Sequence, residues 1–118
     1  MARRLLLLLL LVPLALAAAD VSGKWVMQVE LSAGSGSPTF TFQQNGEKLT
    51  GKYSGTLGEA DVTGTVKGDD VQFQFTVKSD LGELTAKYTG KVTGDTMKGK
   101  ADYGPAVGDG TFEGKRQK

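Results

Sequence analysis

The side chains that could do chemistry in this sequence are aromatic rings and hydroxyls rather than catalytic groups. The chain contains no His and no Cys, so the commonest general base, the usual metal ligands and a nucleophilic thiol are missing. No base accompanies its Ser and Thr residues in a recognisable pattern. The acidic pair Asp69-Asp70 lacks the further spaced oxygens of a calcium loop. We therefore expect a non-catalytic protein with no cofactor and no metal site.

The candidate binding residues are large aromatic side chains that fall on one face of successive predicted strands. They are Trp25, Phe40, Phe42, Tyr53, Phe73, Phe75, Tyr88 and Tyr103. They could hold a small apolar or amphipathic ligand, or they could simply fill a hydrophobic core with the tyrosine hydroxyls near a rim. A cavity of about 300 Å³ or more that opens at one rim would favour a ligand, and a filled interior would argue against one.

The sequence alternates strictly between apolar and polar residues, and this alternation places the aromatic rings on one face of each predicted strand. Val71, Phe73, Phe75 and Val77 alternate with polar residues, which is typical of a strand with one wet face. Gly, Asn and Asp clusters interrupt the alternation at hairpin spacing, and no segment has a helical period. The pattern predicts eight strands, near 23–32, 38–44, 48–54, 60–67, 71–78, 83–92, 96–103 and 110–117.

Short connections make these strands antiparallel neighbours in an up-and-down meander. We therefore predict an all-β fold in which eight antiparallel strands close into a small barrel, with a two-sheet β-sandwich as the alternative. Closure would remove both sheet edges. Small residues at inward positions fit a tightly curved sheet; they are Gly51, Gly64, Ala86, Gly99, Ala101 and Gly114.

The first residues have the composition of a signal peptide. Arg3 and Arg4 precede the apolar stretch Leu5–Leu16, and Ala17–Ala19 supplies small residues for cleavage before Asp20. We expect residues 1–19 to be a signal peptide, residues 20–118 to be a single barrel domain, and the protein to be secreted or periplasmic. Without Arg3 and Arg4 the remaining chain has 12 basic and 13 acidic residues. This balance argues against a nucleic-acid partner.

The two ends of the mature chain carry a pair of residues that could meet when the sheet closes. Gly23 and Trp25 lie on the first strand, and Arg116 lies on the last with inward parity. An unpaired buried guanidinium is costly, so we expect Arg116 to lie across the face of Trp25 and to bond carbonyls at the barrel end. We assign this group to structural closure.

Two segments are longer than a tight turn. Ser32–Pro38 and Gly104–Gly110 are rich in Gly, Ser and Pro, and we expect flexible rim loops at both positions. Such loops are either plain connectors or the places where a protein partner binds.

Several of these motifs resemble the calycin superfamily of lipocalins, fatty-acid-binding proteins and avidins. Gly23-Lys24-Trp25 is similar to the Gly-x-Trp of the first calycin strand, and Arg116 to the late basic residue that packs on it. Thr50-Gly51-Lys52-Tyr53 is similar to an avidin strand whose Tyr binds biotin. Where avidins have an Asn and a hydroxyl residue, this chain has Met27 and Gly55. The resemblance therefore implies the barrel and not biotin binding.

The chain is also similar to Gly-rich, all-β domains of exported bacterial proteins that end in Phe-x-Gly-x-Arg, here Phe112 to Arg116. Three functions remain open at this point. The protein could bind a small apolar or amphipathic ligand among its inward aromatics, act as an inhibitor-like interaction module at the rim loops, or serve as a structural domain with a filled core. After signal cleavage we expect no stable insertion into a membrane.

Overall fold

The computed structural model describes residues 19–79 and 82–117, and all of its regular structure is β-strand. The predicted signal peptide lies almost entirely outside the described residues. The strands are β1 (Gly23–Leu31), β2 (Gly34–Gly36), β3 (Thr39–Asn45), β4 (Lys48–Gly55), β5 (Gly58–Lys67), β6 (Asp70–Ser79), β7 (Gly82–Thr93), β8 (Thr96–Asp102) and β9 (Asp109–Arg116).

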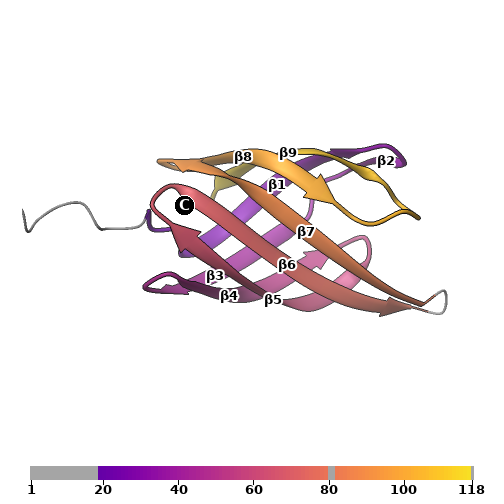
Figure 1. The fold of residues 1–118 in the computed structure, drawn as a ribbon, viewed down its shortest axis with the longest axis horizontal. Helices are drawn as coiled ribbons and strands as arrows, with labels where there is room; N and C mark the ends of the chain where they lie inside the picture. The colour runs from indigo at the N-terminus through magenta and orange to yellow at the C-terminus, as the bar shows by residue number, and fades with distance from the viewer. Residues whose placement is uncertain (1–18, 80–81, 118) are drawn as a thin grey trace, which may run out of the picture.

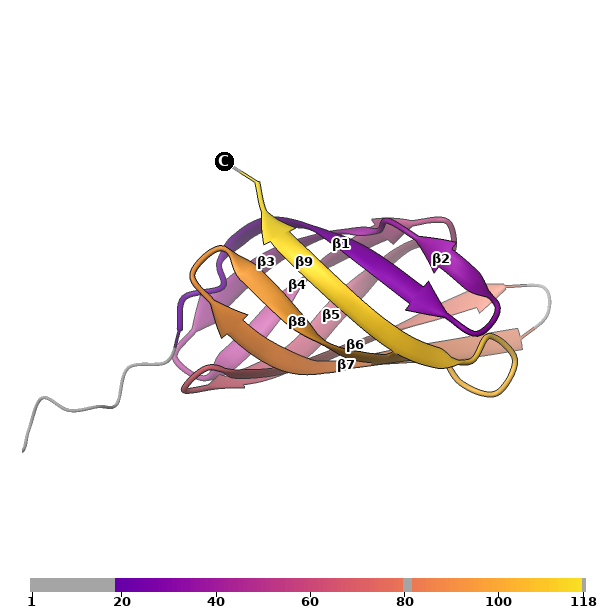
Figure 2. The same cartoon turned by 90° about the horizontal axis from the view of Figure 1, so that it is seen from above.

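Eight long antiparallel strands close into a barrel, as the alternation predicts. Each strand from β3 to β9 pairs with the next along the chain, and β1 pairs with β3. The first and last strands then pair along seven residues, from Trp25 opposite Arg116 to Leu31 opposite Gly110. Figure 2 shows this seam, with β9 running beside β1. Because the sheet closes on itself, the sandwich alternative is wrong.

Alternation determines which side chains fill the interior. Along β6, Val71, Phe73, Phe75 and Val77 are buried, and the residues between them are exposed. On β1, Trp25, Met27 and Val29 are likewise buried, and the residues between them are half-buried or exposed. Within the described part of the chain every buried side chain is hydrophobic or tyrosine, so the barrel has a single apolar core.

The predicted loop over Ser32–Pro38 is wrong. The chain turns tightly at Ser32 and Ala33, and Gly34–Gly36 then forms β2, which pairs with Val29–Leu31 of β1. Only Ser37 and Pro38 separate β2 from β3, and the carbonyl of Pro38 still accepts the amide of Met27 at 2.9 Å. A Gly/Ser composition weakens strand propensity, but pairing with β1 supplies partners for the backbone and overrides it.

The second predicted rim loop is shorter and more ordered than its composition suggests. Strand β9 already begins at Asp109, and a compact turn connects it to β8. In this turn the amide of Gly108 donates to the carbonyl of Gly104 at 2.7 Å, and the amide of Tyr103 donates to Gly108 at 3.0 Å.

Glycines let neighbouring strands approach closely enough for a barrel this narrow. A Cβ at Gly99 would lie 2.0 Å from the carbonyl oxygen of Thr89, and one at Gly64 would lie 2.0 Å from that of Gln72. Backbone atoms cannot yield as a flexible side chain can, so a larger residue at either position would force the strands apart. These two positions belong to the inward small set that the sequence indicates.

Arg116 and Trp25 seal one end of the barrel, as predicted. The guanidinium carbon of Arg116 lies 4.7 Å from the centre of the Trp25 ring, which is a cation–π contact. Trp25 is fully buried, and its indole N–H donates to the carbonyl of Val21 at 3.0 Å. Gly23 has a positive φ of 121°, and a Cβ there would lie 3.9 Å from the Arg116 side chain.

The guanidinium also ties together three separate segments at this end. It donates to the carbonyls of Ser22 at 2.6 Å and Asp20 at 2.7 Å, and to the Asp95 carboxylate at 2.7 Å. Asp95 lies in the β7–β8 turn, whereas Asp20 and Ser22 precede β1. The planar fork of Arg fits several acceptors at once, so one side chain fixes the entry of the chain, its last strand and a turn.

At the opposite end of the barrel the strands end at different heights. β6 and β7 continue past their other neighbours as a two-stranded hairpin, which extends beyond the rim in both views (Figures 1 and 2). β5 pairs with β6 only as far as Phe75, and β8 pairs with β7 only from Lys87. This end therefore carries strand edges with exposed backbone.

The sealed end generates a prediction about coupling. We expect Trp25→Ala to lower the free energy of unfolding by about 3–5 kcal/mol through lost packing, and Arg116→Ala to lower it as well. Because the two side chains share one contact, the double variant should be about 0.5–2 kcal/mol less damaging than the sum of the single variants. Denaturant unfolding measures all three.

Lys24→Ala provides the control for this cycle, because Lys24 is exposed next to Trp25. Its effect should add to that of Arg116→Ala within about 0.5 kcal/mol. If the Trp25 and Arg116 effects also add within that limit, the contact does not stabilise the fold.

Candidate functional site

The sequence-predicted aromatics divide into a filled interior and a small group at the open end. In the middle of the barrel, Phe73 stacks on Tyr88 with ring centres 4.8 Å apart, and Phe40 meets both rings edge-on. Phe42 lies 4.9 Å from Phe73 in a T-shaped contact. These rings occupy one another's space, so the middle of the barrel is packed by its own side chains.

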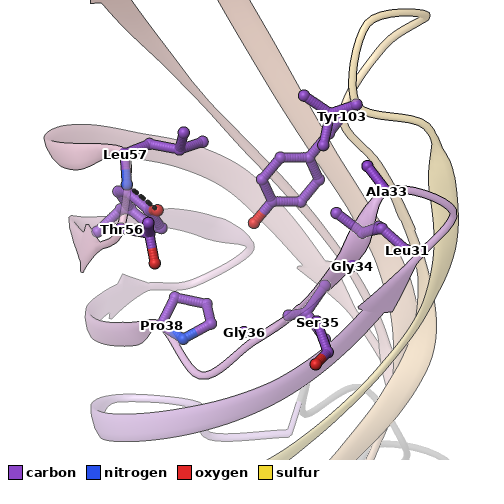
Figure 3. A pocket seen from close by; sticks show the side chains of 12 residues that line it. Leu31, Ala33, Gly34, Ser35, Gly36, Pro38, Thr56, Leu57 and Tyr103 are labelled. Atoms are coloured by element: carbon purple, nitrogen blue, oxygen red, sulfur yellow. Dashed lines mark hydrogen bonds between the residues drawn. The ribbon is translucent and has the colours of Figure 1, made fainter.

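A pocket of about 200 Å³ opens at the end of the barrel opposite Arg116 (Figure 3). β1 and β2, the β4–β5 turn and the turn between β8 and β9 form its walls. Its lining is largely apolar and consists of Val29, Leu31, Ala33, Gly34, Ser35, Gly36, Pro38, Tyr53, Thr56, Leu57, Tyr103 and Val107. Leu57 is 41 % exposed, the only large hydrophobic side chain exposed in the described ranges 19–79 and 82–117.

The tyrosine hydroxyls gather at the inner side of this pocket. Tyr53 lies on β4, Tyr88 on β7, and Tyr103 directly after β8. The hydroxyls of Tyr88 and Tyr103 share a short hydrogen bond. The Tyr53 hydroxyl accepts the amide of Leu57 at 3.4 Å, which fixes the β4–β5 turn beside the pocket. In Figure 3 the Tyr103 hydroxyl points across the pocket.

The direction of the Tyr88–Tyr103 bond follows from burial. Tyr88 is fully buried, and its hydroxyl contacts no acceptor other than Tyr103 among the residues described. If Tyr103 were the donor, the Tyr88 hydrogen would be buried without an acceptor, which is costly. Tyr88 therefore donates, and the hydroxyl hydrogen of Tyr103 remains available to the pocket.

Burial keeps these phenols protonated. Burial raises the pKa of Tyr88 far above its ordinary value of 10.0, and the adjacent Tyr103 raises it further. Burial also raises the pKa of Tyr103 to about 12, although the hydrogen bond from Tyr88 opposes that rise. The pKa of Tyr53 is raised by burial as well, against the hydrogen bond from Leu57. At neutral pH the pocket therefore offers neutral hydroxyl donors.

Of the eight candidate binding residues, Tyr53 and Tyr103 line the pocket. Tyr88 and Phe75 lie directly behind them; Phe75 stacks on Tyr53 with centres 3.9 Å apart and meets Tyr103 at 5.9 Å. Phe40, Phe42 and Phe73 are part of the packed interior. Trp25 lies at the sealed end with Gly23 and Arg116.

The remaining wall residues form two groups. Six lie in the two segments predicted as rim loops, namely Ala33, Gly34, Ser35, Gly36, Pro38 and Val107. Val29, Leu31, Thr56 and Leu57 were missed from the sequence. One signal was available. Leu57 is the second residue of the two-residue turn Thr56–Leu57 between β4 and β5, where a polar residue is usual. A large apolar side chain in a hairpin turn does not help to form the turn. Its presence there indicates that it contacts another apolar group.

No group of three or more His, Asp or Glu side chains that could hold a metal ion occurs in the part of the chain that the structure describes. Nor do these residues form any helix long and apolar enough to cross a membrane. No model of a known protein family matches the sequence, and a search of curated proteins finds no match. The site must therefore be interpreted from its own geometry.

The tyrosine cluster predicts a pH dependence. In the unfolded chain the tyrosine phenols ionise near pH 10. In the folded barrel their pKa values are higher, and that of Tyr103 is about 12. The unfolded state then binds fewer protons, so the free energy of unfolding should fall as the pH rises above about 10. Phenolate absorbance and denaturant unfolding at each pH measure the two effects.

Tyr88→Phe should make this fall shallower, because it removes the most strongly shifted phenol. The pKa values of Lys52 and Lys91 are also raised, by hydrogen bonds to Asp61 and Asp70. These two lysines also lower the free energy of unfolding as the pH rises. Their effect is the same in wild type and in Tyr88→Phe, so the difference between the two proteins reports the tyrosines. Native tyrosines that titrate near pH 10 with no loss of stability would contradict the buried cluster.

Proposed function

We propose that the protein is an exported, non-catalytic barrel that binds a small apolar or amphipathic molecule at its open end. The observation that carries this proposal is the pocket of about 200 Å³ beside Leu57, which combines an apolar wall with the hydroxyls of Tyr53 and Tyr103. An apolar hollow with a few convergent polar groups is the usual form of a small-molecule site.

The volume limits the size of the ligand. It is smaller than the roughly 300 Å³ that the sequence-based prediction requires for a ligand and that drug-sized molecules need. A long lipid chain would have no room in the packed interior. An engineered apolar cavity of about 150 Å³ in another protein holds benzene. The pocket here therefore suits a single ring or a short branched chain. Such small ligands bind with dissociation constants on the order of 1 mM or somewhat lower.

The polar lining limits the chemistry of the ligand. The Tyr103 hydroxyl hydrogen needs an acceptor, and the lining residues include no Lys or Arg to balance a negative charge. A carboxylate in this pocket would lose hydration without gaining a partner cation. A neutral acceptor such as a ketone or amide carbonyl meets both requirements.

The proposal also includes export and a barrel of the calycin-like type. The basic and apolar leader before Asp20 supports export. The contact of Trp25 on β1 with Arg116 on β9 supports the calycin likeness, because Gly23-x-Trp25 and a late basic residue are the motifs of that resemblance. The packed interior favours one alternative, a structural domain without any ligand.

Two probes of similar shape separate these functions. Acetophenone carries a carbonyl acceptor, and isopropylbenzene replaces it with a methyl-bearing carbon. Amide chemical shifts in an NMR titration should move around Leu57 and Val107 with both probes, and acetophenone should bind more tightly by about two- to tenfold, the value of one net hydrogen bond.

Tyr103→Phe and Tyr88→Phe form a matched pair of variants, because each removes the same Tyr88–Tyr103 hydrogen bond and only Tyr103 lines the pocket. Tyr103→Phe should abolish the preference for acetophenone, and Tyr88→Phe should keep it. If neither probe moves the amides at the open end, the ligand-binding proposal is wrong and the structural alternative stands.

A further inference from the structure

The β6–β7 hairpin leaves strand edges without a neighbour at the open end. Among the described residues, Thr76–Lys78 of β6 and Glu83–Thr85 of β7 pair with each other and with no third strand. Unpaired strand edges offer rows of N–H and C=O groups to any other strand. Of the two edges, that of β7 lies on the side where β8 pairs further along the strand.

The register shows which backbone groups point outward from this edge. The amide of Val92 donates to the carbonyl of Asp69 at 2.9 Å, at the other end of the same ladder. In an antiparallel ladder bonded pairs alternate with non-bonded pairs. Val77 and Leu84 are therefore a bonded pair, and the next pair, Thr76 and Thr85, is not. Glu83 and Thr85 accordingly direct their backbone N–H and C=O groups away from β6.

A groove runs beside the same edge and gives it room for a further strand. Its volume is about 670 Å³, and the segment from Asp102 to Val107 forms its far wall. Leu84 is only partly buried there and lies near the exposed Leu57. On the outer face Glu83 and Lys87 are both exposed and lie four residues apart on the same strand.

We propose that a second copy of this chain occupies the groove and pairs its own β7 edge antiparallel to the first. The twofold axis passes through Leu84. Glu83 of each copy then lies opposite Thr85 of the other, and the outward backbone groups of these residues bond in two symmetric pairs. The two Leu84 side chains meet on the apolar face.

Charge complementarity favours a second copy over an unrelated strand. With Leu84 on the axis, Glu83 of one copy lies diagonal to Lys87 of the other, within reach of long side chains. The symmetry makes this contact twice. Within one copy Lys78 lies 3.9 Å from Glu83, but both side chains are well exposed and such a pair contributes little. Pairing through one edge also closes the assembly at two copies.

The interface is small. One short strand pair and two leucines bury less than the 1,200–2,000 Å² of total surface that is about standard for stable complexes. The dimer is therefore weak, with monomer and dimer exchanging across ordinary laboratory concentrations.

Sedimentation equilibrium up to about 1 mM protein tests the proposal. Thr85→Pro removes the outward N–H of the β7 edge, and Thr76→Pro removes the outward N–H of the β6 edge. Both variants lose the same hydroxyl contact between Thr76 and Thr85, which are 2.9 Å apart. Wild type and Thr76→Pro should dimerise alike, and Thr85→Pro should stay monomeric. Equal behaviour of the two variants, or a monomeric wild type at the highest concentration, would overturn the proposal.

A charge exchange keeps the proposal testable if a proline variant fails to fold. Glu83→Lys turns two attractive contacts into repulsive ones and should raise the dimer dissociation constant by about tenfold. Adding Lys87→Glu should restore most of the lost affinity. If Glu83→Lys has no effect, or if the double variant is no better than the single one, this edge is not the dimer interface.

Discussion

The contact of Arg116 with Trp25 is the constraint on which the rest of the barrel depends. It stands where the first and last strands meet, and the same guanidinium binds the chain before β1 and the β7–β8 turn. An open sheet of eight strands, in a chain without cysteine, has two edges whose backbone groups need partners. Pairing β1 with β9 satisfies them, and Arg116 fixes the register of that pairing at one end.

Because Arg116 and Trp25 close one end of the barrel, a binding site is expected at the opposite end. Closure at this small radius brings inward aromatics from facing strands into contact, and they fill the interior down to the sealed end. The apolar pocket lies where the strands end at different heights. The pocket beside Leu57, the groove beside β7 and the unpaired hairpin edges all follow from that unevenness. Tyr103 links the packed interior to the pocket, because it lines the pocket and its hydroxyl bonds that of the buried Tyr88.

Much of the fold could be predicted from the sequence, because alternation and turn residues are local properties. The strands, the inward parity of Phe73 and the meeting of Trp25 with Arg116 all follow from period two and chain order. The pairing of Gly34–Gly36 with β1 could not be predicted, since it depends on a partner strand and not on composition. The pocket could not be predicted either. The meeting of Leu31, Leu57 and Val107 around one pocket depends on how far each strand extends, which parity does not determine.

The barrel is closed between β1 and β9, and its end opposite Arg116 is open. Native-state hydrogen exchange tests this arrangement residue by residue, under conditions where the protein is monomeric. The amide of Gln117 bonds the carbonyl of Lys24, so ladder alternation directs the amides of Gln28 and Glu113 across the seam. We expect these two amides to exchange only through global unfolding, like that of Phe73, and the outward amides of Glu83 and Thr85 to exchange quickly. Fast exchange of Gln28 and Glu113 would mean that the sheet is open at the seam, and would contradict the account.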